Sequence, residues 1–272
     1  MWILLAVLLL LAMLWLVLIM PARSSSAQRA PFCRRTFAHR GLFSADQSVP
    51  ENSLAAFRAA VDAGYGVELD VQLTRDKQVV VFHDDDLKRV CGVDARVDAY
   101  SYAELQALPL FGTAERIPLF ADVLDMIDGK IPMIVELKSG GDWRALCPKV
   151  LALLRAYRGD YCVESFHPLL VRWFYQNAPE ILRGQLSEAA RYSRRWVPLY
   201  QAIVMSRLLT NVMTHPQFIA YRIGPKCLSV RICERLGAMR VAWTARPSDD
   251  RAKLIRHSDA IIFEHDRPDP RF

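Results

Sequence analysis

Pairs of charged side chains stand two residues apart inside apolar runs of this sequence. The run Val67–Val71 contains Glu68 and Asp70, and Glu136 and Lys138 repeat this spacing further along the chain. On a strand, side chains two residues apart point to the same face. Two carboxylates on one apolar face are costly to bury unless a cation lies between them. Solvation at a sheet edge is the alternative for the first pair, and a simple ion pair is the alternative for the second.

Two histidines end apolar runs of strand type. His39 is followed directly by Arg40, and His83 follows the run Val79–Phe82. A histidine can exchange a proton near neutral pH, and an arginine can hold an anion through two hydrogen bonds. A surface turn is the alternative for the first group, and a buried core histidine is the alternative for His83.

Together these segments supply the groups that one reaction needs. Three carboxylates suit a hard divalent cation, an arginine and a lysine suit phosphate oxygens, and two histidines suit a general base and a general acid. Glu51 adds a further carboxylate, although its segment Pro50–Ser53 is also typical of a helix start capped by Asn52 or Ser53. The combination indicates metal-assisted hydrolysis of a phosphodiester.

The segments that must position these groups alternate between strand and helix patterns. The candidate strands are Arg35–His39, Gly66–Leu73, Val79–His83, Pro132–Leu137, Tyr161–Phe166, Leu182–Leu186, Phe218–Ile223, Arg240–Thr244 and Ala260–Phe263. Helical patterns include Ser53–Ala63, Trp143–Ala156, Pro168–Asn177, Pro198–Val212, Ser229–Leu236 and Pro247–Arg256. This alternation predicts an α/β fold, a (β/α)8 TIM barrel over residues 35–272, with a doubly wound open sheet as the alternative. A barrel gathers its strand ends in one ring, and residues 84–119 are expected to form an excursion after His83.

An apolar segment opens the chain. The 19 residues from Trp2 to Met20 carry no charge, and a helix of that length spans roughly 28 Å, close to the hydrocarbon thickness of a bilayer. We therefore predict a transmembrane anchor at residues 1–22 and a basic, Ser-rich linker at residues 23–34. The alternative is a signal peptide, which would make the protein secreted or periplasmic. The absence of a basic start and the length of the apolar run argue against a signal peptide.

Charge after the anchor predicts its orientation. Basic residues precede the first acidic residue, Asp46, and should keep that side in the cytoplasm; they are Arg23, Arg29, Arg34, Arg35 and Arg40. The protein is thus predicted to be a single-pass membrane protein with a cytoplasmic barrel. Because five of the formal +6 charges are local to this stretch, an anionic leaflet is a more suitable partner than nucleic acid, and the alternative is that these arginines only set the topology. No protein partner is predicted, and six scattered cysteines without a C-x-x-C pair are typical of reduced cytosolic thiols.

The order of the motifs resembles the glycerophosphodiester phosphodiesterase family. The main motifs are His39-Arg40-Gly41, Pro50-Glu51-Asn52-Ser53, Glu68-Leu69-Asp70, His83-Asp84 and Glu136-Leu137-Lys138. Further likeness lies in Leu87-Lys88-Arg89, Arg116-Ile117-Pro118, Ser165-Phe166, Ala242-Trp243-Thr244 and Ala260-Ile261-Ile262. The chain departs from the family pattern in the long connection Leu42–Val49, in Phe263-Glu264-His265 where the family usually has a Thr-Asp pair, and in His167 after Phe166.

The resemblance implies roles for the named residues. Glu68, Asp70 and Glu136 would bind one divalent cation, which would be Mg²⁺, Ca²⁺ or Mn²⁺, and Glu51 would support or join the metal shell. His39 and His83 would form the acid/base pair, with His39 assigned as the base and His83 as the acid, although the sequence leaves this order open. The phosphate would be held by Arg40 and Lys138, and the glycerol or alcohol would be lined by Trp243 and Phe166. A buried core position is the alternative for Trp243.

The resemblance also implies the reaction. The expected activity is hydrolysis of a glycerophosphodiester, or of a lysophospholipid at the bilayer, to glycerol 3-phosphate and an alcohol. Two other functions remain as alternatives at this point: a non-catalytic phospholipid-binding barrel, and a phospholipase D of the sphingomyelinase type.

Overall fold

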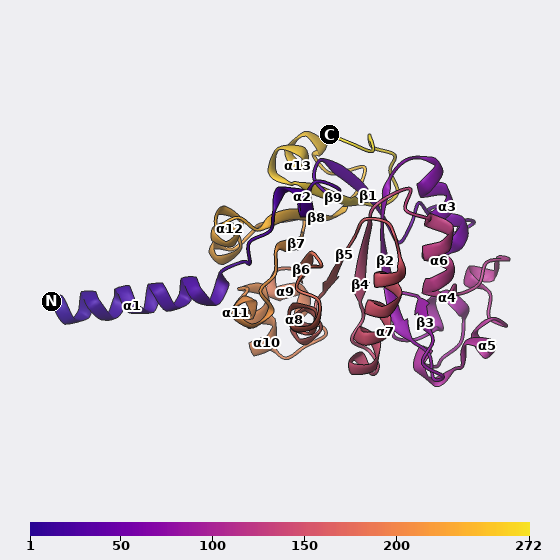
Figure 1. Cartoon of the computed structure of the whole chain (residues 1–272), viewed down its shortest axis with the longest axis horizontal. Coiled ribbons are helices and arrows are strands. Elements are labelled where there is room, and N and C mark those ends of the chain that lie inside the picture. Colours follow the sequence, from indigo (N-terminus) through magenta and orange to yellow (C-terminus); the bar gives the residue numbers. More distant parts are fainter.

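Eight parallel strands close into a barrel in the computed structural model, which describes residues 1–272 (Figure 1). In barrel order the strands are β1 (Arg35–His39), β2 (Gly66–Leu73), β4 (Met133–Leu137), β5 (Tyr161–Ser165), β6 (Arg183–Ser187), β7 (Phe218–Arg222), β8 (Met239–Ala245) and β9 (Ala260–Phe263). The first strand pairs in parallel with both β2 and β9, so the sheet closes on itself. The predicted (β/α)8 TIM barrel is therefore confirmed, and the open sheet is excluded.

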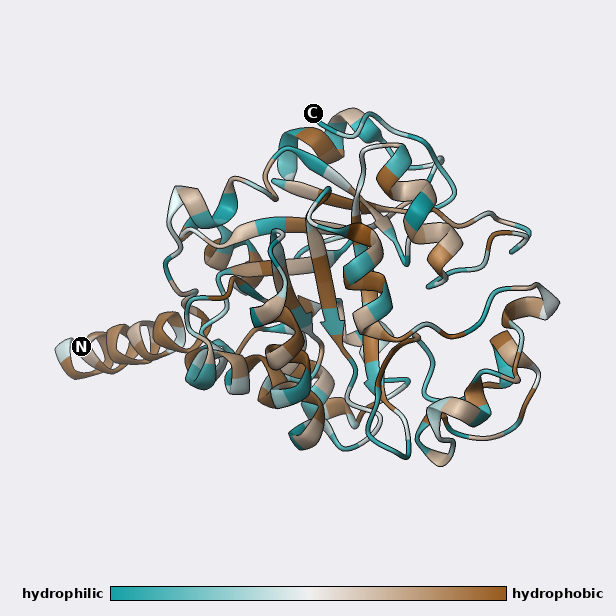
Figure 2. Cartoon of the chain, turned by 45° about the vertical axis from the view of Figure 1, so that its right-hand side comes forward, coloured by the Kyte–Doolittle hydropathy of each residue, from teal (hydrophilic) through white to brown (hydrophobic).

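Helices cover the outside of this barrel (Figures 1 and 2). They are α3 (Leu54–Asp62), α6 (Phe120–Ile127), α7 (Trp143–Ala156), α8 (Pro168–Asn177), α9 (Ala190–Ser193), α10 (Leu199–Ser206), α11 (Asn211–Thr214), α12 (Leu228–Arg235) and α13 (Arg251–His257). A large apolar cluster that includes Phe57 and Phe174 lies between helices and strands. A second cluster, with Phe37 and Phe218, belongs to the opposite faces of the strands and fills the barrel.

Two predicted helices differ from the observed ones. The pattern at Pro198–Val212 is divided into α10 and α11, because the chain turns at Leu208, which has a positive φ of 58°. The helix predicted from Pro247 begins instead at Arg251, where the side chain of Asp250 accepts a hydrogen bond from Lys253 N. Neither change moves a candidate site residue.

The predicted strand at Val79–His83 is not a barrel strand. β3 (Val79–Val81) runs antiparallel to β2 and pairs with its last residues. An apolar run shows where a strand lies but not its direction, and here a tight turn after Thr74 reverses the chain. The predicted excursion follows and has a small apolar core of its own, formed with α4 (Lys88–Cys91), η1 (Val97–Ala99), α5 (Tyr102–Leu105) and η2 (Leu110–Gly112).

The apolar leader forms one long helix that projects from the barrel. α1 (Trp2–Ile19) is long and apolar enough to cross a membrane by its length and composition, and almost all of it is exposed (Figures 1 and 2). Its last residue is fixed to the barrel domain, because Asn211 Nδ2 donates to Ile19 O at 3.0 Å. The segment expected as a linker is folded in part: it contains α2 (Ser26–Arg29) and Phe32, whose ring stacks on Phe37 in the barrel core.

Candidate active site

Three buried carboxylates meet at the carboxyl ends of β2 and β4. Glu68 and Asp70 point into the barrel because the alternating residues Val67 and Leu69 face the surrounding helices. Asp70 is the register partner of Glu136. One oxygen atom from each of the three acidic residues lies within 4.8 Å of the others. The structure thus brings together the three residues that the sequence predicted as metal ligands, and we call them the carboxylate cluster.

Repulsion within the carboxylate cluster affects its pKa values. Burial and then the negative charges of Asp70 and Glu136 raise the pKa of Glu68 well above its ordinary value. Burial also raises the pKa of Glu136 to about 7, against the opposing effect of Lys138. For Asp70 the effect of burial is outweighed by neighbouring positive charges, of which Lys138 is the strongest, and its pKa is lowered. Additional positive charge between these groups would relieve the repulsion.

Two cations and one amide hold the carboxylates in place. Lys138 Nζ lies 3.3 Å from Asp70 Oδ1 and 3.0 Å from Glu136 Oε1. Arg40 Nε lies 3.6 Å from Asp70 Oδ2, and Asn52 Nδ2 donates a hydrogen bond to the same oxygen at 2.9 Å. Both predicted phosphate-binding residues therefore lie beside the carboxylate cluster.

His39 ends β1 next to the carboxylate cluster. Its Nδ1 lies 3.0 Å from Glu264 Oε2, and its Nε2 lies 3.8 Å from Glu68 Oε2. Burial and then the charge of Arg40 lower the pKa of His39. Burial of Glu264 is outweighed by hydrogen bonds from His39 and Arg246, which hold its pKa at about 2. The ionised Glu264 therefore binds Nδ1 and turns Nε2 of His39 toward the cluster.

His83 reaches the same place by a different route. β1 pairs with the first residues of β2, and β3 pairs with the last residues of β2 along the same edge. Just after β3, Phe82 N donates a hydrogen bond to Asp70 O at 2.9 Å. His83 Nδ1 lies 2.6 Å from Asp84 Oδ1. Burial and then the charge of Lys138 lower the pKa of His83 to about 4, so this imidazole is neutral at neutral pH. The two histidines thus approach Glu68 and Asp70 from the ends of two strands that share one edge of β2.

Glu51, which was expected to support or join the metal shell, is not among the three carboxylates of the cluster and contacts two arginines. Its Oε1 accepts hydrogen bonds from Arg40 Nη1 at 2.7 Å and Arg89 Nη2 at 2.6 Å, and its Oε2 accepts from Arg89 Nη1 at 3.0 Å. Two guanidinium groups therefore satisfy both of its oxygens, and Glu51 positions Arg40 instead of offering a free ligand atom.

Phe166 and Trp243 form an aromatic wall on the other side of the barrel. Phe166 follows β5, and Trp243 lies on β8. Its register partner is Arg222, the last residue of β7. The rings of Phe166 and Trp243 pack edge to face with centroids 5.6 Å apart. Trp243 Nε1 donates to Ala220 O at 3.0 Å, so its polar atom is satisfied inside the protein. Both side chains are half-buried, which leaves part of each ring available at the mouth of the barrel.

Sequence reasoning assigned no role to several residues of this site. Asp84 and Arg89 were named only as parts of motifs, and Glu264 was named only as a departure from the family pattern. Asn52 had been considered for the helix cap that the structure gives to Ser53, whose side chain accepts from Ala56 N.

Glu164 was also missed. It is the register partner of Glu136, is fully enclosed, and has one oxygen without a hydrogen-bond partner. Burial and then the charge of Glu136 raise its pKa well above the ordinary value. The sequence did contain a signal for Glu164, because it is a single carboxylate within the short run Tyr161–Ser165. A carboxylate within a short strand-type run is also the pattern that made Glu136 a candidate.

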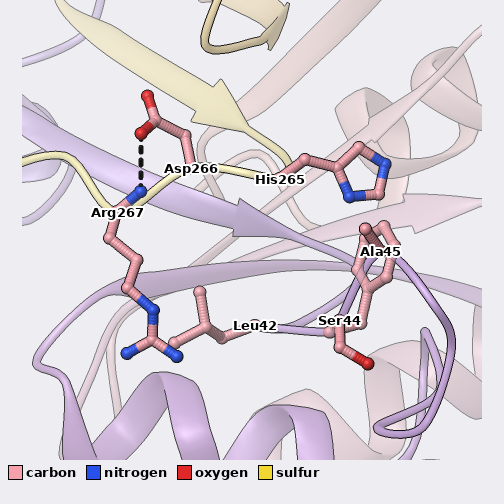
Figure 3. Close-up of a pocket in the computed structure, with 7 residues that line it drawn as sticks. Leu42, Ser44, Ala45, His265, Asp266 and Arg267 are labelled. Carbon is pink, nitrogen blue, oxygen red and sulfur yellow. Dashed lines mark hydrogen bonds between the residues drawn. The ribbon is translucent and has the colours of Figure 1, made fainter.

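Two of the three departures from the family pattern meet at one pocket. It has a volume of about 260 Å³ and lies between residues 42–45, which follow β1, and residues 265–267, which follow β9 (Figure 3). The rings of Phe43 and His265 pack edge to face with centroids 5.0 Å apart. Because Glu264 directly precedes His265 and His39 lies three residues before Leu42, the pocket lies on the rim of the candidate site.

Comparisons with known proteins agree on one family. A sequence model of the glycerophosphoryl diester phosphodiesterase family matches residues 39–269. A glycerophosphodiester phosphodiesterase of Caldanaerobacter subterraneus is 29% identical over 239 residues, which cover 84% of this chain and 92% of that protein. Lysophospholipase D GDPD1 of Rattus norvegicus is 33% identical over 160 residues, which cover 54% of this chain and 49% of that protein.

Solved structures show the same fold. A phosphodiesterase from Oleispira antarctica in complex with the product sn-glycerol-3-phosphate superposes with a TM-score of 0.69 at 24% identity, covering 85% of this chain and 93% of that chain. A glycerophosphodiester phosphodiesterase from Thermotoga maritima superposes with a TM-score of 0.62 at 24% identity, covering 84% of this chain and 93% of that chain.

Proposed function

The chain belongs to the glycerophosphoryl diester phosphodiesterase family, and from this premise we propose that it hydrolyses glycerophosphodiesters to glycerol 3-phosphate and an alcohol in a metal-dependent reaction. The observation that carries the proposal is the convergence of three carboxylates from β2 and β4 with two histidines from the ends of β1 and β3. Binding of a phospholipid alone would not require two proton-transfer groups, which makes a non-catalytic barrel the weaker candidate.

The carboxylate cluster fits a divalent cation. Its donor atoms are all carboxylate oxygens, which Mg²⁺, Ca²⁺ and Mn²⁺ prefer. Burial and repulsion between the carboxylates raise the pKa of Glu68 and of Glu136, so an added positive charge would stabilise their ionised forms. Glu68, Asp70 and Glu136 would therefore hold one such ion. When bound, the ion would neutralise phosphate charge and orient the attacking oxygen.

The remaining side chains suit the other requirements of phosphodiester hydrolysis. Arg40, held by Glu51, and Lys138 are placed to bind the phosphate oxygens. We assign His39 as the general base, because Glu264 holds its Nδ1 and leaves Nε2 to take a proton from the attacking oxygen. His83 is then the acid that donates a proton to the leaving alcohol oxygen, because the negative charge of a bound phosphate would raise its pKa from the low value of the free protein and protonate it.

Phe166 and Trp243 are assigned to the glycerol or alcohol part of the substrate. Their half-buried rings lie at the mouth, where an apolar surface can pack on carbon atoms of the substrate. The rim pocket beside His265 is a further surface for the alcohol, since it is built from the segments in which this chain departs from its family.

The direct test is an assay of the purified full chain in mild detergent. With Mg²⁺, Ca²⁺ or Mn²⁺ supplied in turn, we expect release of glycerol 3-phosphate from glycerophosphocholine, and a chelator should abolish this release. Tight binding of metal and phosphodiester without turnover would favour the non-catalytic barrel instead. Turnover of sphingomyelin to a cyclic phosphate would favour the sphingomyelinase-type phospholipase.

A lysophospholipid is the proposed alternative substrate. Support comes from the apolar α1, which would place the enzyme at a bilayer, and from the similarity to a rat protein named lysophospholipase D. The same assay with lysophosphatidylcholine decides this point, because release of choline without glycerol 3-phosphate identifies cleavage on the head-group side of a lysolipid.

We also propose a membrane location. Residues 1–22 would form a single-pass anchor, residues 23–34 would follow it, and residues 35–272 would form a cytoplasmic catalytic domain, in accordance with the arginines that follow α1. Release of the full chain from membranes by alkaline carbonate would contradict this anchor.

Glu264 offers a test of the proposed role of His39. Because the hydrogen bond and charge of Glu264 raise the pKa of His39, the substitution Glu264→Gln should lower that pKa and move the acidic limb of the kcat/KM pH profile to lower pH. Loss of orientation should also reduce kcat by about 10-fold to 100-fold. The matched control is Arg246→Gln, which removes the exposed partner of Glu264 but leaves its bond to His39. An unchanged acidic limb in the Glu264 variant would argue against His39 as the base.

A further inference from the structure

Exposed apolar side chains gather on one part of the barrel domain. Outside the leader, nine large hydrophobic side chains are exposed, and seven of them lie between residues 196 and 236: Trp196, Leu199, Tyr200, Ile203, Val212, Leu228 and Leu236. Trp196 is the most exposed of these, at 85%. Exposure of an isolated apolar residue is ordinary, but a concentration of this kind on and directly beside α10, α11 and α12 marks an interaction surface.

The same part of the chain is strongly basic. No Asp or Glu occurs from Ala189 to Cys233, whereas seven Lys or Arg residues do: Arg191, Arg194, Arg195, Arg207, Arg222, Lys226 and Arg231. Only Arg222 and Lys226 form ion pairs with carboxylates. The other five are exposed and therefore add unpaired positive charge to the apolar surface.

This surface adjoins the base of α1. The last residue of α1 is held by Asn211 of α11, and Ala22 N donates to Pro216 O at 2.8 Å, just before β7. In Figure 1, α10, α11 and α12 lie on the side of the barrel from which α1 projects. A bilayer crossed by α1 would therefore face these helices.

We infer that residues 191–236 form a docking surface for an anionic lipid bilayer. A Trp and a Tyr next to aliphatic side chains suit the interface between head groups and acyl chains, and arginines around them suit anionic head groups. Because α9 begins just after the carboxyl end of β6, the surface extends to the rim of the barrel mouth. Docking would lay this rim against the lipid, which is where a lysophospholipid substrate resides.

A cavity lies between this surface and the barrel mouth. Its volume is about 160 Å³, and residues that line it include Ala190 and Ile203 from α9 and α10, and Tyr221 and Pro225 from the end of β7 and the loop after it. The lining is largely apolar, so this cavity is placed to accept the first part of an acyl chain as a lipid enters from the bilayer.

The inference rests on the proposed anchor for its geometry, and both can be tested with the full chain in lipid nanodiscs. The variant Trp2→Phe/Trp15→Phe removes the tryptophans of α1, so fluorescence then comes from the barrel domain. In discs of phosphatidylcholine and phosphatidylglycerol with bromine near the head groups, we expect loss of the fluorescence that Trp196 contributes. Adding Trp196→Phe should remove this lipid-dependent loss.

Charge reversal tests the anionic part of the inference. Arg194→Glu/Arg195→Glu should restore the fluorescence of Trp196 in the brominated discs, whereas Arg58→Glu/Lys149→Glu, with the same charge change on the exposed faces of α3 and α7, should not. Retention of protein on the discs reports on α1 separately. If the protein stays on the discs but the fluorescence loss is the same with and without Trp196, the docking surface is overturned and the anchor is not. Protein that fails to bind the discs at all would overturn both, and equal effects of the two charge reversals would overturn recognition of anionic lipid.

Discussion

Replacing a single residue of the carboxylate cluster should abolish turnover while changing stability in opposite directions at different positions. We expect Glu68→Gln, Asp70→Asn and Glu136→Gln each to lower kcat/KM by about 10³-fold or more, since a catalytic metal ion contributes several kcal/mol of transition-state stabilisation. A steady-state assay with saturating divalent cation measures this loss.

The stability of the metal-free protein gives the sharper readout. Folding raises the pKa of Glu68 and raises that of Glu136 to about 7. Above pH 4.5, near the pKa of a glutamate in the unfolded chain, ionisation of either residue therefore destabilises the folded state. At pH 8 in chelator, Glu68→Gln and Glu136→Gln should therefore raise Tm by a few degrees, and at pH 4.5 they should have little effect. The pKa of Asp70 is lowered, so its charge stabilises the fold and Asp70→Asn should lower Tm.

Addition of metal should then reverse the order of Tm between the unsubstituted chain and the Glu68 and Glu136 variants. A divalent cation that binds only the folded state should raise the Tm of the unsubstituted chain, and the variants should show little or no shift. If metal raises Tm equally in all four proteins, the ion binds elsewhere and the proposed ligand set is wrong.

Loss of either histidine should be nearly as severe, although metal binding should persist. We expect His39→Ala and His83→Ala each to lower kcat by about 10²-fold to 10⁴-fold, which is the usual contribution of a positioned acid or base. The metal-induced shift in Tm should remain, since neither imidazole belongs to the carboxylate cluster. The matched control is His257→Ala, which changes an exposed histidine at the end of α13.

An activated substrate distinguishes the two imidazoles. A glycerophosphodiester with a p-nitrophenyl leaving group needs no protonation of that group, so the defect of the variant that lacks the general acid should shrink. Our assignment predicts this recovery for His83→Ala and not for His39→Ala. Recovery in His39→Ala alone would reverse the two roles, and near-normal activity of both variants on glycerophosphocholine would exclude acid/base catalysis by either residue.

The carboxylate cluster was predictable because a strand converts spacing directly into direction. Glu68 and Asp70 stand two residues apart between apolar neighbours, so both had to face the barrel interior once Val67 and Leu69 faced the helices. Glu136 occupies the equivalent place on the next parallel strand, and parallel strands align their carboxyl ends. Local periodicity and the repetition of strand and helix were therefore sufficient for a parallel α/β arrangement and for this part of the site, whereas closure into a barrel was decided by the pairing of β1 with β9.

Partners that lie far apart in sequence could not be predicted in this way. Glu51 is a free carboxylate in sequence, but one of its two guanidinium partners, Arg89, reaches it only after the segment that follows β3 folds back. Glu264 meets His39 only because β9 closes the barrel against β1. Such pairings depend on which strands become neighbours, and no local pattern contains that information.

The sequence by itself determined the alternation of strands and helices, the apolar leader and the types of group at the mouth, because each follows from short-range periodicity and composition. Only the tertiary structure decided that the sheet closes into a barrel, that His83 follows an antiparallel strand, that Glu51 contacts two arginines, and that exposed apolar side chains lie on the helices beside the base of α1. The reason is physical: chain direction, ion pairing and exposure depend on what packs against a residue, and that is set by contacts between distant segments.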